Sequence, residues 1–310
     1  MADRKTKSPA ASAKSKRATP LERKSLLRVS YQGEPGANSH LACREVFPDL
    51  EPVACATFED ALAAVKSGDA RYAMIPIENS VAGRVADIHH LLPNAELHIV
   101  GEHFLRVRHQ LMALPGASLL TVKQALSHTQ ALGQCRNTLR KLGLRPVPEA
   151  DTAGSARLVS ESNDMQLAAI APSLAAEIYG LKILMQDIED EKHNTTRFVV
   201  LANEADDARP GEGPIVTTFF FRVRNLPAAL YKAMGGFATN GVNMTKLESY
   251  QLDGRFVATM FYADIDGHRD DLPVQRALEE LGYFSTELKI LGSYRASPFR
   301  AEANKAGDAS

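Results

Sequence analysis

The chain has 310 residues, an ordinary balance of apolar and charged side chains and a net charge of −1, as expected of a globular protein of about two domains. No apolar run is long enough to cross a membrane. Three cysteines without paired spacing argue against a disulfide framework or a zinc site and favour a reducing compartment. We therefore expect a cytoplasmic protein that needs no metal or other cofactor and binds no membrane.

The charge is unevenly distributed along the chain. The first 27 residues carry a net charge of +6, which leaves −7 on the remainder. Residues 1–25 are rich in Lys, Ser and Ala and lack aromatic residues, a composition that predicts a disordered basic tail. The acidic remainder argues against nucleic acid as a partner.

Strands and helices alternate from residue 26 to residue 204. The strands are expected at 26–31, 72–77, 97–105, 109–114, 146–147 and 167–171. The helices are expected at 39–46, 58–66, 81–92, 127–142, with Ser127 as N-cap, and 172–179. A further helix is expected to start at residues 151–155. This alternation predicts an α/β architecture with a mostly parallel sheet.

A polar, breaker-rich stretch over residues 205–214 predicts a linker. After it the order becomes strand 215–222, helix 226–238, strands 242–251 and 255–265, helix 272–281 and strand 285–291. This βαββαβ order is ferredoxin-like. We assign it to a second domain over 215–295 and expect residues 296–310 to form a flexible C-terminus.

Four polar turns open helices in the first domain, at Gly33–Ser39, Glu78–Ser80, Ser127–Gln130 and Thr152–Ser155. In α/β folds ligands lie at the carboxyl ends of strands, against helix N-termini that favour anions. Ordinary helix capping explains any one of these turns by itself. Together they indicate a site for a small anionic molecule.

The run Asn194–Phe198 adds polar groups at the start of an apolar strand. Because a strand alternates its faces, Thr196 and Phe198 point one way and Arg197 the other. No G-x-G-x-x-G, Walker A or H-E-x-x-H motif offers a competing interpretation. A ligand with two carboxylates would fit these turns and this strand.

These segments resemble the motif series of prephenate dehydratases. The matching runs, in order, are Pro76–Ser80, Ser127–Cys135, Thr152–Ala156 and Thr196–Phe198, with Asn243–Ser249 similar to the marker of the regulatory ACT domain. The resemblance implies a bilobal catalytic domain over 26–204, similar to type II periplasmic binding proteins, followed by the ACT domain. It also implies that prephenate loses CO2 and its ring hydroxyl to give phenylpyruvate for L-phenylalanine biosynthesis.

The resemblance also implies the roles of individual residues. Thr196 would hydrogen-bond the departing hydroxyl and Arg197 would orient a carboxylate. Since alternation turns Arg197 away from a ligand that Thr196 faces, either a twist or bulge lets both reach it or Arg197 organises the residues around it. The substrate-binding residues would be Asn38, Ser39, Glu78, Asn79, Ser80, Ser127, His128, Gln130, Thr152, Ala153, Gly154, Arg197 and Phe198.

The ACT resemblance implies feedback by L-phenylalanine and a homodimer or homotetramer formed through this domain. The phenylalanine site would use Ala229, Leu230, Asn243, Met244, Thr245, Glu248 and Ser249. Two stretches depart from the family pattern: Ala228-Ala229-Leu230 replaces Gly-Ala-Leu, and Glu248-Ser249-Tyr250-Gln251 replaces Glu-Ser-Arg-Pro. A domain used only for assembly is the alternative.

Two alternatives to prephenate dehydration stay open. The Pro35-Gly36-Ala37 run looks like that of arogenate dehydratases, although we favour prephenate. A non-catalytic amino-acid or keto-acid sensor could use the same binding fold, but would not need the Thr-Arg-Phe run. The basic tail is too short for a chorismate mutase segment, so we expect a monofunctional enzyme.

Overall fold

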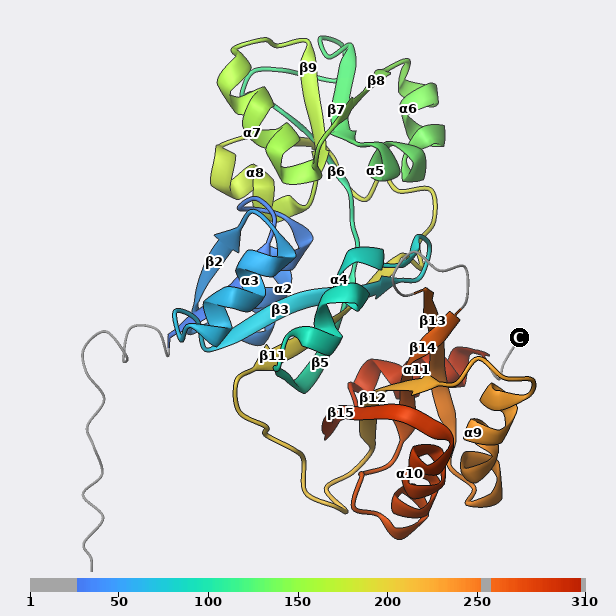
Figure 1. Ribbon diagram of the computed structural model, residues 1–310. Coiled ribbons are helices and arrows are strands. Elements are labelled where there is room, and N and C mark those ends of the chain that lie inside the picture. Colours follow the sequence, from blue (N-terminus) through green and yellow to red (C-terminus); the bar gives the residue numbers. More distant parts are fainter. Residues whose placement is uncertain (1–26, 252–257, 308–310) are drawn as a thin grey trace, which may run out of the picture.

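The computed structural model describes residues 27–251 and 258–307. The basic tail expected over residues 1–25 lies outside the described residues. The chain forms two α/β lobes and a C-terminal domain, which are blue to cyan, green and orange to red in Figure 1. The expected bilobal α/β fold followed by a βαββαβ domain is confirmed.

The first lobe is built around a sheet of order β2-β1-β3-β11-β5, with the short β4 paired to β3. Its strands are β1 (Arg28–Gln32), β2 (Glu51–Cys55), β3 (Tyr72–Asn79), β4 (Gly83–Arg84), β5 (His98–Arg106) and β11 (Thr195–Ala202). Its helices are α2 (Asn38–Val46), α3 (Phe58–Lys66) and α4 (Ala86–Leu91), followed by the 3-10 turn η1 (Leu92–Asn94).

The second lobe has a sheet of order β10-β6-β9-β7-β8. Its strands are β6 (Gln110–Ala113), β7 (Gln124–His128), β8 (Arg145–Glu149), β9 (Leu167–Ala171) and β10 (Lys182–Met185). Its helices are α5 (Thr129–Gln134), α6 (Arg136–Leu142), α7 (Thr152–Ser162) and α8 (Ser173–Tyr179).

Both sheets are mixed rather than mostly parallel. The parallel pairs join β1 to β2 and β3, and β7 to β8 and β9. The antiparallel pairs join β3 to β4, β11 to β3 and β5, and β6 to β9 and β10. Because the chain leaves the first lobe after β5 and returns at β11, the returning strand runs against its neighbours.

The helix expected over 127–142 is divided in two, and its start differs from the expectation. Ser127 is the buried fourth residue of β7, where its Oγ donates to the carbonyl of Ile170 at 2.6 Å. His128 is the N-cap instead, and its Nδ1 accepts from the Gln130 amide at 3.3 Å. Gly143 ends the second helix with a φ of 65°, as its position predicts.

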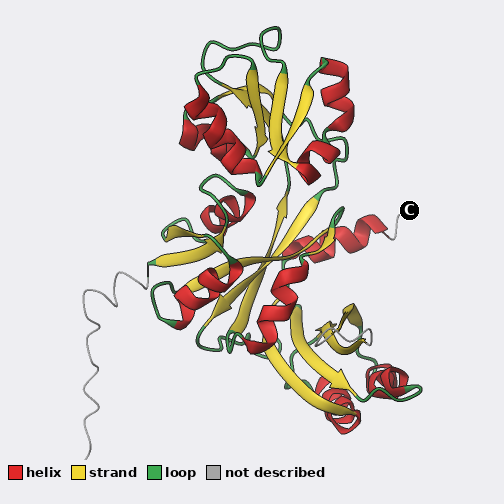
Figure 2. Ribbon diagram, turned by 45° about the horizontal axis from the view of Figure 1, so that its top comes forward, coloured by secondary structure: helices red, strands yellow, loops and turns green. Residues whose placement is uncertain are grey.

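The C-terminal domain is an antiparallel sheet of order β13-β14-β12-β15 with two helices on one face (Figure 2). Its elements are β12 (Ile215–Val223), α9 (Ala229–Thr239), β13 (Met244–Gln251), β14 (Ala258–Asp266), α10 (Leu272–Phe284) and β15 (Ser285–Arg295). No helix or strand lies between Ala202 and Ile215, where a linker was expected.

The other face of this sheet shares a hydrophobic core with the first lobe. Phe220, Tyr250 and Tyr262 belong to the same buried cluster as Ile77 and Ile88. Strand β15 approaches β5 so closely that a Cβ on Gly292 would collide with the carbonyl oxygen of Ile99. The first lobe and the C-terminal domain are therefore packed together and not merely tethered.

The C-terminal segment differs from the flexible end expected over 296–310. Residues Pro298–Gly307 form helix α11. Phe299 stacks on Phe104 of β5 at 4.7 Å between ring centroids, and Arg300 forms an ion pair with Glu102. These contacts attach the helix to the first lobe. Across residues 27–251 and 258–307, no helix is long and apolar enough to cross a membrane.

Candidate active site

A cavity of about 370 Å³ lies between the two lobes, a size suited to a small-molecule site. Each of the four polar turns expected to bind an anion contributes to its wall. The lining residues are Asn38, Ser39, Pro76, Asn79, Ala82, Gly83, Arg84, Val85, Val107, His109, His128, Gln130, Ala131, Gln134, Thr152, Asn194, Thr196 and Phe198.

A bulge in β3 places Asn79 on the cavity side. Thr196 pairs with Asn79 and Arg197 with Glu78, but Phe198 pairs with Pro76, so Ile77 is an extra residue on β3. The extra residue puts Pro76 and Asn79 on the same face, and both line the cavity. On β11 the alternation holds, with Thr196 and Phe198 in the cavity wall.

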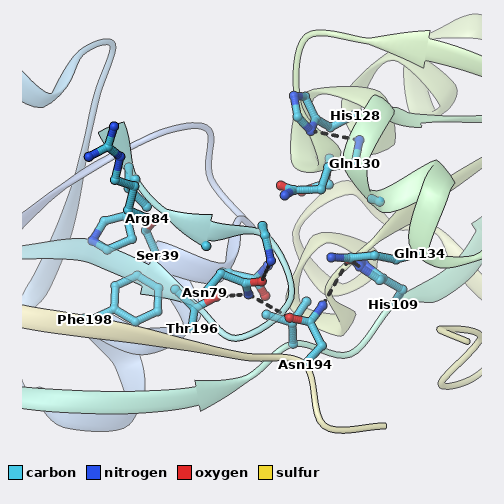
Figure 3. Close-up of a pocket in the computed structure, with 18 residues that line it drawn as sticks. Ser39, Asn79, Arg84, His109, His128, Gln130, Gln134, Asn194, Thr196 and Phe198 are labelled. Atoms are coloured by element: carbon cyan, nitrogen blue, oxygen red, sulfur yellow. Dashed lines mark hydrogen bonds between the residues drawn. The ribbon is translucent and has the colours of Figure 1, made fainter. Parts of the chain in front are cut away.

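Asn79 fixes the hydrogen-bonding role of Thr196 (Figure 3). Its Oδ1 accepts from the backbone amides of Val81 and Ala82 at 3.0 and 2.8 Å, so its amide nitrogen faces the other way. That Nδ2 donates to Thr196 Oγ1 at 2.9 Å and to Asn194 Oδ1 at 2.7 Å. Because an amide nitrogen can only donate, the Thr196 hydroxyl is the acceptor and keeps its own proton for another partner.

The same chain of bonds continues to the second lobe. Asn194 Nδ2 donates to Gln134 Oε1 at 3.0 Å, and the same oxygen lies 2.8 Å from His109 Nε2. Since Gln134 Oε1 only accepts, Nε2 of His109 carries the proton and Nδ1 does not. Burial lowers the pKa of His109, although Gln134 and Glu189 oppose that shift. The ring is therefore neutral, with a fixed tautomer.

The electrostatics of the cavity favour an anion. Of the described residues that line it, none is Asp or Glu and only Arg84 carries a permanent charge. One guanidinium among neutral donors is a combination that binds small anionic ligands. At the start of α7, next to Thr152, the Asp151 carboxylate already caps the Gly154 amide at 2.6 Å.

Six of the expected substrate-binding residues do not line the cavity: Glu78, Ser80, Ser127, Ala153, Gly154 and Arg197. Ser80 Oγ instead donates to the carbonyl of His193 and accepts from the Thr195 amide, both at 2.9 Å. It thereby holds the start of β11 against the turn after β3. The remaining seven expected residues, and Thr196, line the cavity.

Arg197 points to the opposite face of β11, so the structure agrees with its organising role and not with direct contact to the ligand. Its Nε donates to Glu102 at 2.9 Å, and its Nη atoms donate to Asp264 at 2.5 Å and to the Tyr294 hydroxyl at 2.9 Å. The guanidinium and both carboxylates are buried.

The charges of this cluster depend on one another. Burial works against the charge of Arg197, but the Asp264 carboxylate raises its pKa well above the usual range. Burial likewise disfavours the Asp264 carboxylate, yet Arg197 holds the pKa of that group below its usual value. Asp264 belongs to β14, so Arg197 joins the first lobe to the C-terminal domain.

Glu78 also faces this side. It forms ion pairs with Arg197 at 3.4 Å and with Lys246 of β13. The residue directly before Asn79 is thus held by the C-terminal domain. On β3 and on β11, one residue therefore faces the cavity and its neighbour in sequence faces the C-terminal domain.

Arg84, His109, Gln134 and Asn194 were not among the expected site residues. Gln134 belongs to the motif run Ser127–Cys135 and Asn194 to the polar run Asn194–Phe198, so weighing every polar residue of those runs would have found them. His109 is a buried histidine at the start of an apolar strand. Arg84 follows Gly83 in a short hairpin, and nothing in its local pattern indicates a ligand.

The residues expected to bind phenylalanine lie on α9 and β13, except Asn243, which directly precedes β13. Leu230 of α9 and Met244 of β13 pack against one hydrophobic cluster. Asn243 Nδ2 donates to Asp266 at 2.7 Å, and Glu248 forms an ion pair with Lys246 at 3.3 Å. Ala229 begins α9, whereas Thr245 and Ser249 lie along β13.

The chain passes twice between two lobes that enclose a polar cavity, and a βαββαβ domain is attached to them. This arrangement is typical of two-lobed proteins that bind small anionic molecules. The sequence model for prephenate dehydratase matches residues 29–206. The chain belongs to the prephenate dehydratase family and is a carbon–oxygen lyase of the aromatic amino acid pathway.

Relatives extend the match beyond the catalytic part. A bifunctional N-acyl-homoserine lactone acylase/prephenate dehydratase of Komagataeibacter europaeus is 51% identical over 273 residues, 88% of this chain and 97% of the relative. Arogenate dehydratase 2 of Petunia hybrida is 40% identical over 285 residues, 87% of this chain and 72% of the relative.

A solved structure shows a similar arrangement over nearly the whole chain. Prephenate dehydratase of Arthrobacter aurescens in complex with L-Phe has a TM-score of 0.80 at 30% identity, covering 91% of this chain and 98% of that one. The match includes the region of the C-terminal domain.

Proposed function

We propose that the protein is a prephenate dehydratase that converts prephenate to phenylpyruvate, CO2 and water. The observation that carries this proposal is the Thr196 hydroxyl in the interlobe cavity. Asn79 occupies its acceptor side at 2.9 Å and leaves its proton free to donate. A neutral donor of this kind suits a leaving hydroxyl, because charge develops on the oxygen as its bond to the ring breaks.

The reaction requires little covalent chemistry from the protein. The bond between the ring and its carboxylate breaks, its electron pair enters the ring, and the hydroxyl on the opposite ring carbon leaves. One proton taken up from solvent balances the release of water. Thr196 donates a hydrogen bond to the departing oxygen. Asn79, which is itself bonded to Asn194, holds Thr196 in position.

Two substrates are compatible with the cavity. Arogenate carries an ammonium where prephenate has a keto group, and the Petunia relative is named for arogenate. We favour prephenate because the 51% identical relative is named for it. The described residues that line the cavity also include no Asp or Glu to pair with an ammonium.

The proposal is tested by incubating the protein with each substrate and measuring phenylpyruvate by its absorbance in alkali and phenylalanine by chromatography. We expect kcat/KM for prephenate to exceed that for arogenate by at least about tenfold. The reverse preference would make the protein an arogenate dehydratase. Absence of both products would leave the non-catalytic sensor as the better interpretation.

We further propose that L-phenylalanine binds the C-terminal domain and inhibits the enzyme, and that this domain forms a homodimer or homotetramer. The A. aurescens structure with L-Phe supports the first part. The second is supported by β13 at the edge of its sheet and by the exposure of Tyr231, 82%, and Leu226, 61%.

Inhibition by titrated phenylalanine and the mass from analytical ultracentrifugation test these two parts. A monomer at micromolar concentration would refute the assembly, and full activity in millimolar phenylalanine would refute the feedback. The cytoplasmic location stays a prediction.

A further inference from the structure

Arg84 occupies an unusual place, because it borders both the cavity and the C-terminal domain. It follows the turn in which Asn79 holds the amides of Val81 and Ala82. In Figure 3 it lies on the same side as Ser39 and Phe198, while His109 and Gln134 lie on the other. Among the described lining residues it is the only permanent charge.

The Arg84 guanidinium contacts strand β13. Its Nη1 donates to the backbone carbonyl of Ser249 at 2.9 Å, and its central carbon lies 5.9 Å from the centre of the Tyr250 ring. Tyr250 is buried and its hydroxyl lies 2.5 Å from Nδ1 of His89 in the first lobe. The strand segment that Arg84 touches is thus fixed to the core between the domains.

The guanidinium retains donors for a second partner. Arginine has five N–H groups in one plane, and a carboxylate takes two of them in parallel. The contact with a neutral carbonyl uses one. A charge-assisted pair with a carboxylate is stronger than a bond to a neutral carbonyl, so a bound anion would set the orientation of Arg84 and thereby change its bond to Ser249.

The two carboxylates of prephenate differ in what they require. The ring carboxylate must leave as CO2, and a guanidinium clamped on it would stabilise the ground state against decarboxylation. The side-chain carboxylate persists in the product and can be held throughout. A permanent cation at the cavity therefore suits the side-chain carboxylate.

We propose that Arg84 binds the side-chain carboxylate of the substrate and that its contact with Ser249 couples this interaction to the position of β13. The inference rests on the proposed dehydratase function and assigns to Arg84 the carboxylate role expected of Arg197. Since coupling between two binding events is reciprocal, a ligand that shifts β13 changes the affinity of the cavity for carboxylates.

The test uses the full-length protein with Arg84→Met and the matched control Arg71→Met. Arg71 also stacks on a tyrosine, with its central carbon 4.9 Å from the centre of the Tyr72 ring, but does not line the cavity. We expect Arg84→Met to raise KM for prephenate about tenfold or more, with kcat within about threefold, because the contact is the same in ground and transition states. Arg71→Met should leave both parameters unchanged.

Calorimetry with phenylpyruvate makes the test independent of turnover, because the product retains the side-chain carboxylate. We expect Kd for phenylpyruvate to rise by a similar factor in Arg84→Met. An unchanged Kd in this variant would overturn the proposal even if the enzyme dehydrates prephenate. Absence of turnover in the wild-type protein with a raised Kd in the variant would refute only the proposed function.

The coupling has its own readout. Phenylalanine should change Kd for phenylpyruvate in the wild-type protein and in Arg71→Met, but by much less in Arg84→Met. A full phenylalanine effect in Arg84→Met would overturn the role of the Ser249 contact. So would an absence of any effect in the wild-type protein.

Discussion

The two faces of the strand pair β3 and β11 differ sharply in charge and surroundings. On the cavity face lie Asn79 and Thr196, both uncharged and next to space for a ligand. On the opposite face lie Glu78 and Arg197, both charged and paired with residues of the C-terminal domain. Each face thus holds one cross-strand pair, Asn79 with Thr196 on the cavity side and Glu78 with Arg197 on the other.

This difference shows how two adjacent residues on one strand can serve two separate functions. Neutral donors suit the cavity, because the substrate brings its own charges and the leaving oxygen needs a proton. Charged groups suit the interface only when they are paired, since an unpaired buried charge is costly. The strands that position Thr196 are thereby attached, on their opposite face, to the domain proposed to bind phenylalanine.

Replacing Arg197 tests the interface face most severely. Arg197→Met leaves the buried carboxylate of Asp264 without its closest partner and should destabilise the protein by about 3–5 kcal/mol, measured by urea unfolding. The control is Arg295→Met, because Arg295 and Glu212 form an exposed ion pair at 2.7 Å. Its loss should cost less than about 1 kcal/mol. Equal losses of unfolding free energy in the two variants would mean that the buried cluster around Arg197 stabilises the protein no more than an exposed ion pair does.

Replacing Thr196 tests the cavity face. Thr196→Val keeps the shape of the side chain but removes the hydroxyl, and kcat should fall about 10²- to 10³-fold. Thr195→Val is the neighbouring control, since the Thr195 hydroxyl donates to the carbonyl of His193 at 3.3 Å and does not line the cavity. Steady-state kinetics with prephenate should show little change in that control.

Replacing Asn79 tests whether the orientation of the Thr196 hydroxyl matters for turnover. Asn79→Ala leaves the Thr196 hydroxyl in place but frees it to rotate and leaves the amides of Val81 and Ala82 without their acceptor. We expect kcat to fall about 10- to 100-fold, less than in Thr196→Val. A control is Asn203→Ala, in which the lost bond to the Val65 carbonyl lies outside the cavity. If kcat in Asn79→Ala equals the wild-type value, the fixed orientation of Thr196 is unimportant.

The histidine at the interface gives a smaller, pH-dependent effect. Burial, assisted by Lys246, lowers the pKa of His89 from 6.5 to about 4. The unfolded chain therefore takes up a proton that the folded protein refuses, and stability is lost as the pH falls from about 6.5 to about 4, by up to about 3 kcal/mol.

His89→Asn removes this titration and keeps an oxygen to accept from Tyr250. Unfolding free energies measured across this pH range should fall less steeply in the variant than in the wild-type protein. Parallel curves for the two proteins would contradict a neutral, buried His89.

Much of the architecture could be predicted from local sequence signals. The bounds of α3 and β9 agree with their expected ranges, because a capped helix and a buried apolar strand each have strong local patterns. The four polar turns converge on one cavity, as the rule for α/β sheets implies. Strand alternation correctly separated Thr196 from Arg197.

The remaining features depend on tertiary contacts. The bulge at Ile77, which turns Glu78 away and Asn79 inward, is set by pairing between β3 and β11. The short edge strands β4 and β10 have too few residues for a periodic pattern. Asp264, the nearest partner of Arg197, lies 67 positions away in another domain. Helix α11 depends on contacts with Phe104 and Glu102 that its own sequence does not reveal.

The division between the two faces is tested most directly by measuring kcat and the free energy of unfolding side by side in Thr196→Val. We expect kcat to fall at least about 100-fold while the free energy of unfolding stays within about 1 kcal/mol of the wild-type value. Turnover within about threefold of wild type would contradict the assignment of Thr196 to the departing hydroxyl.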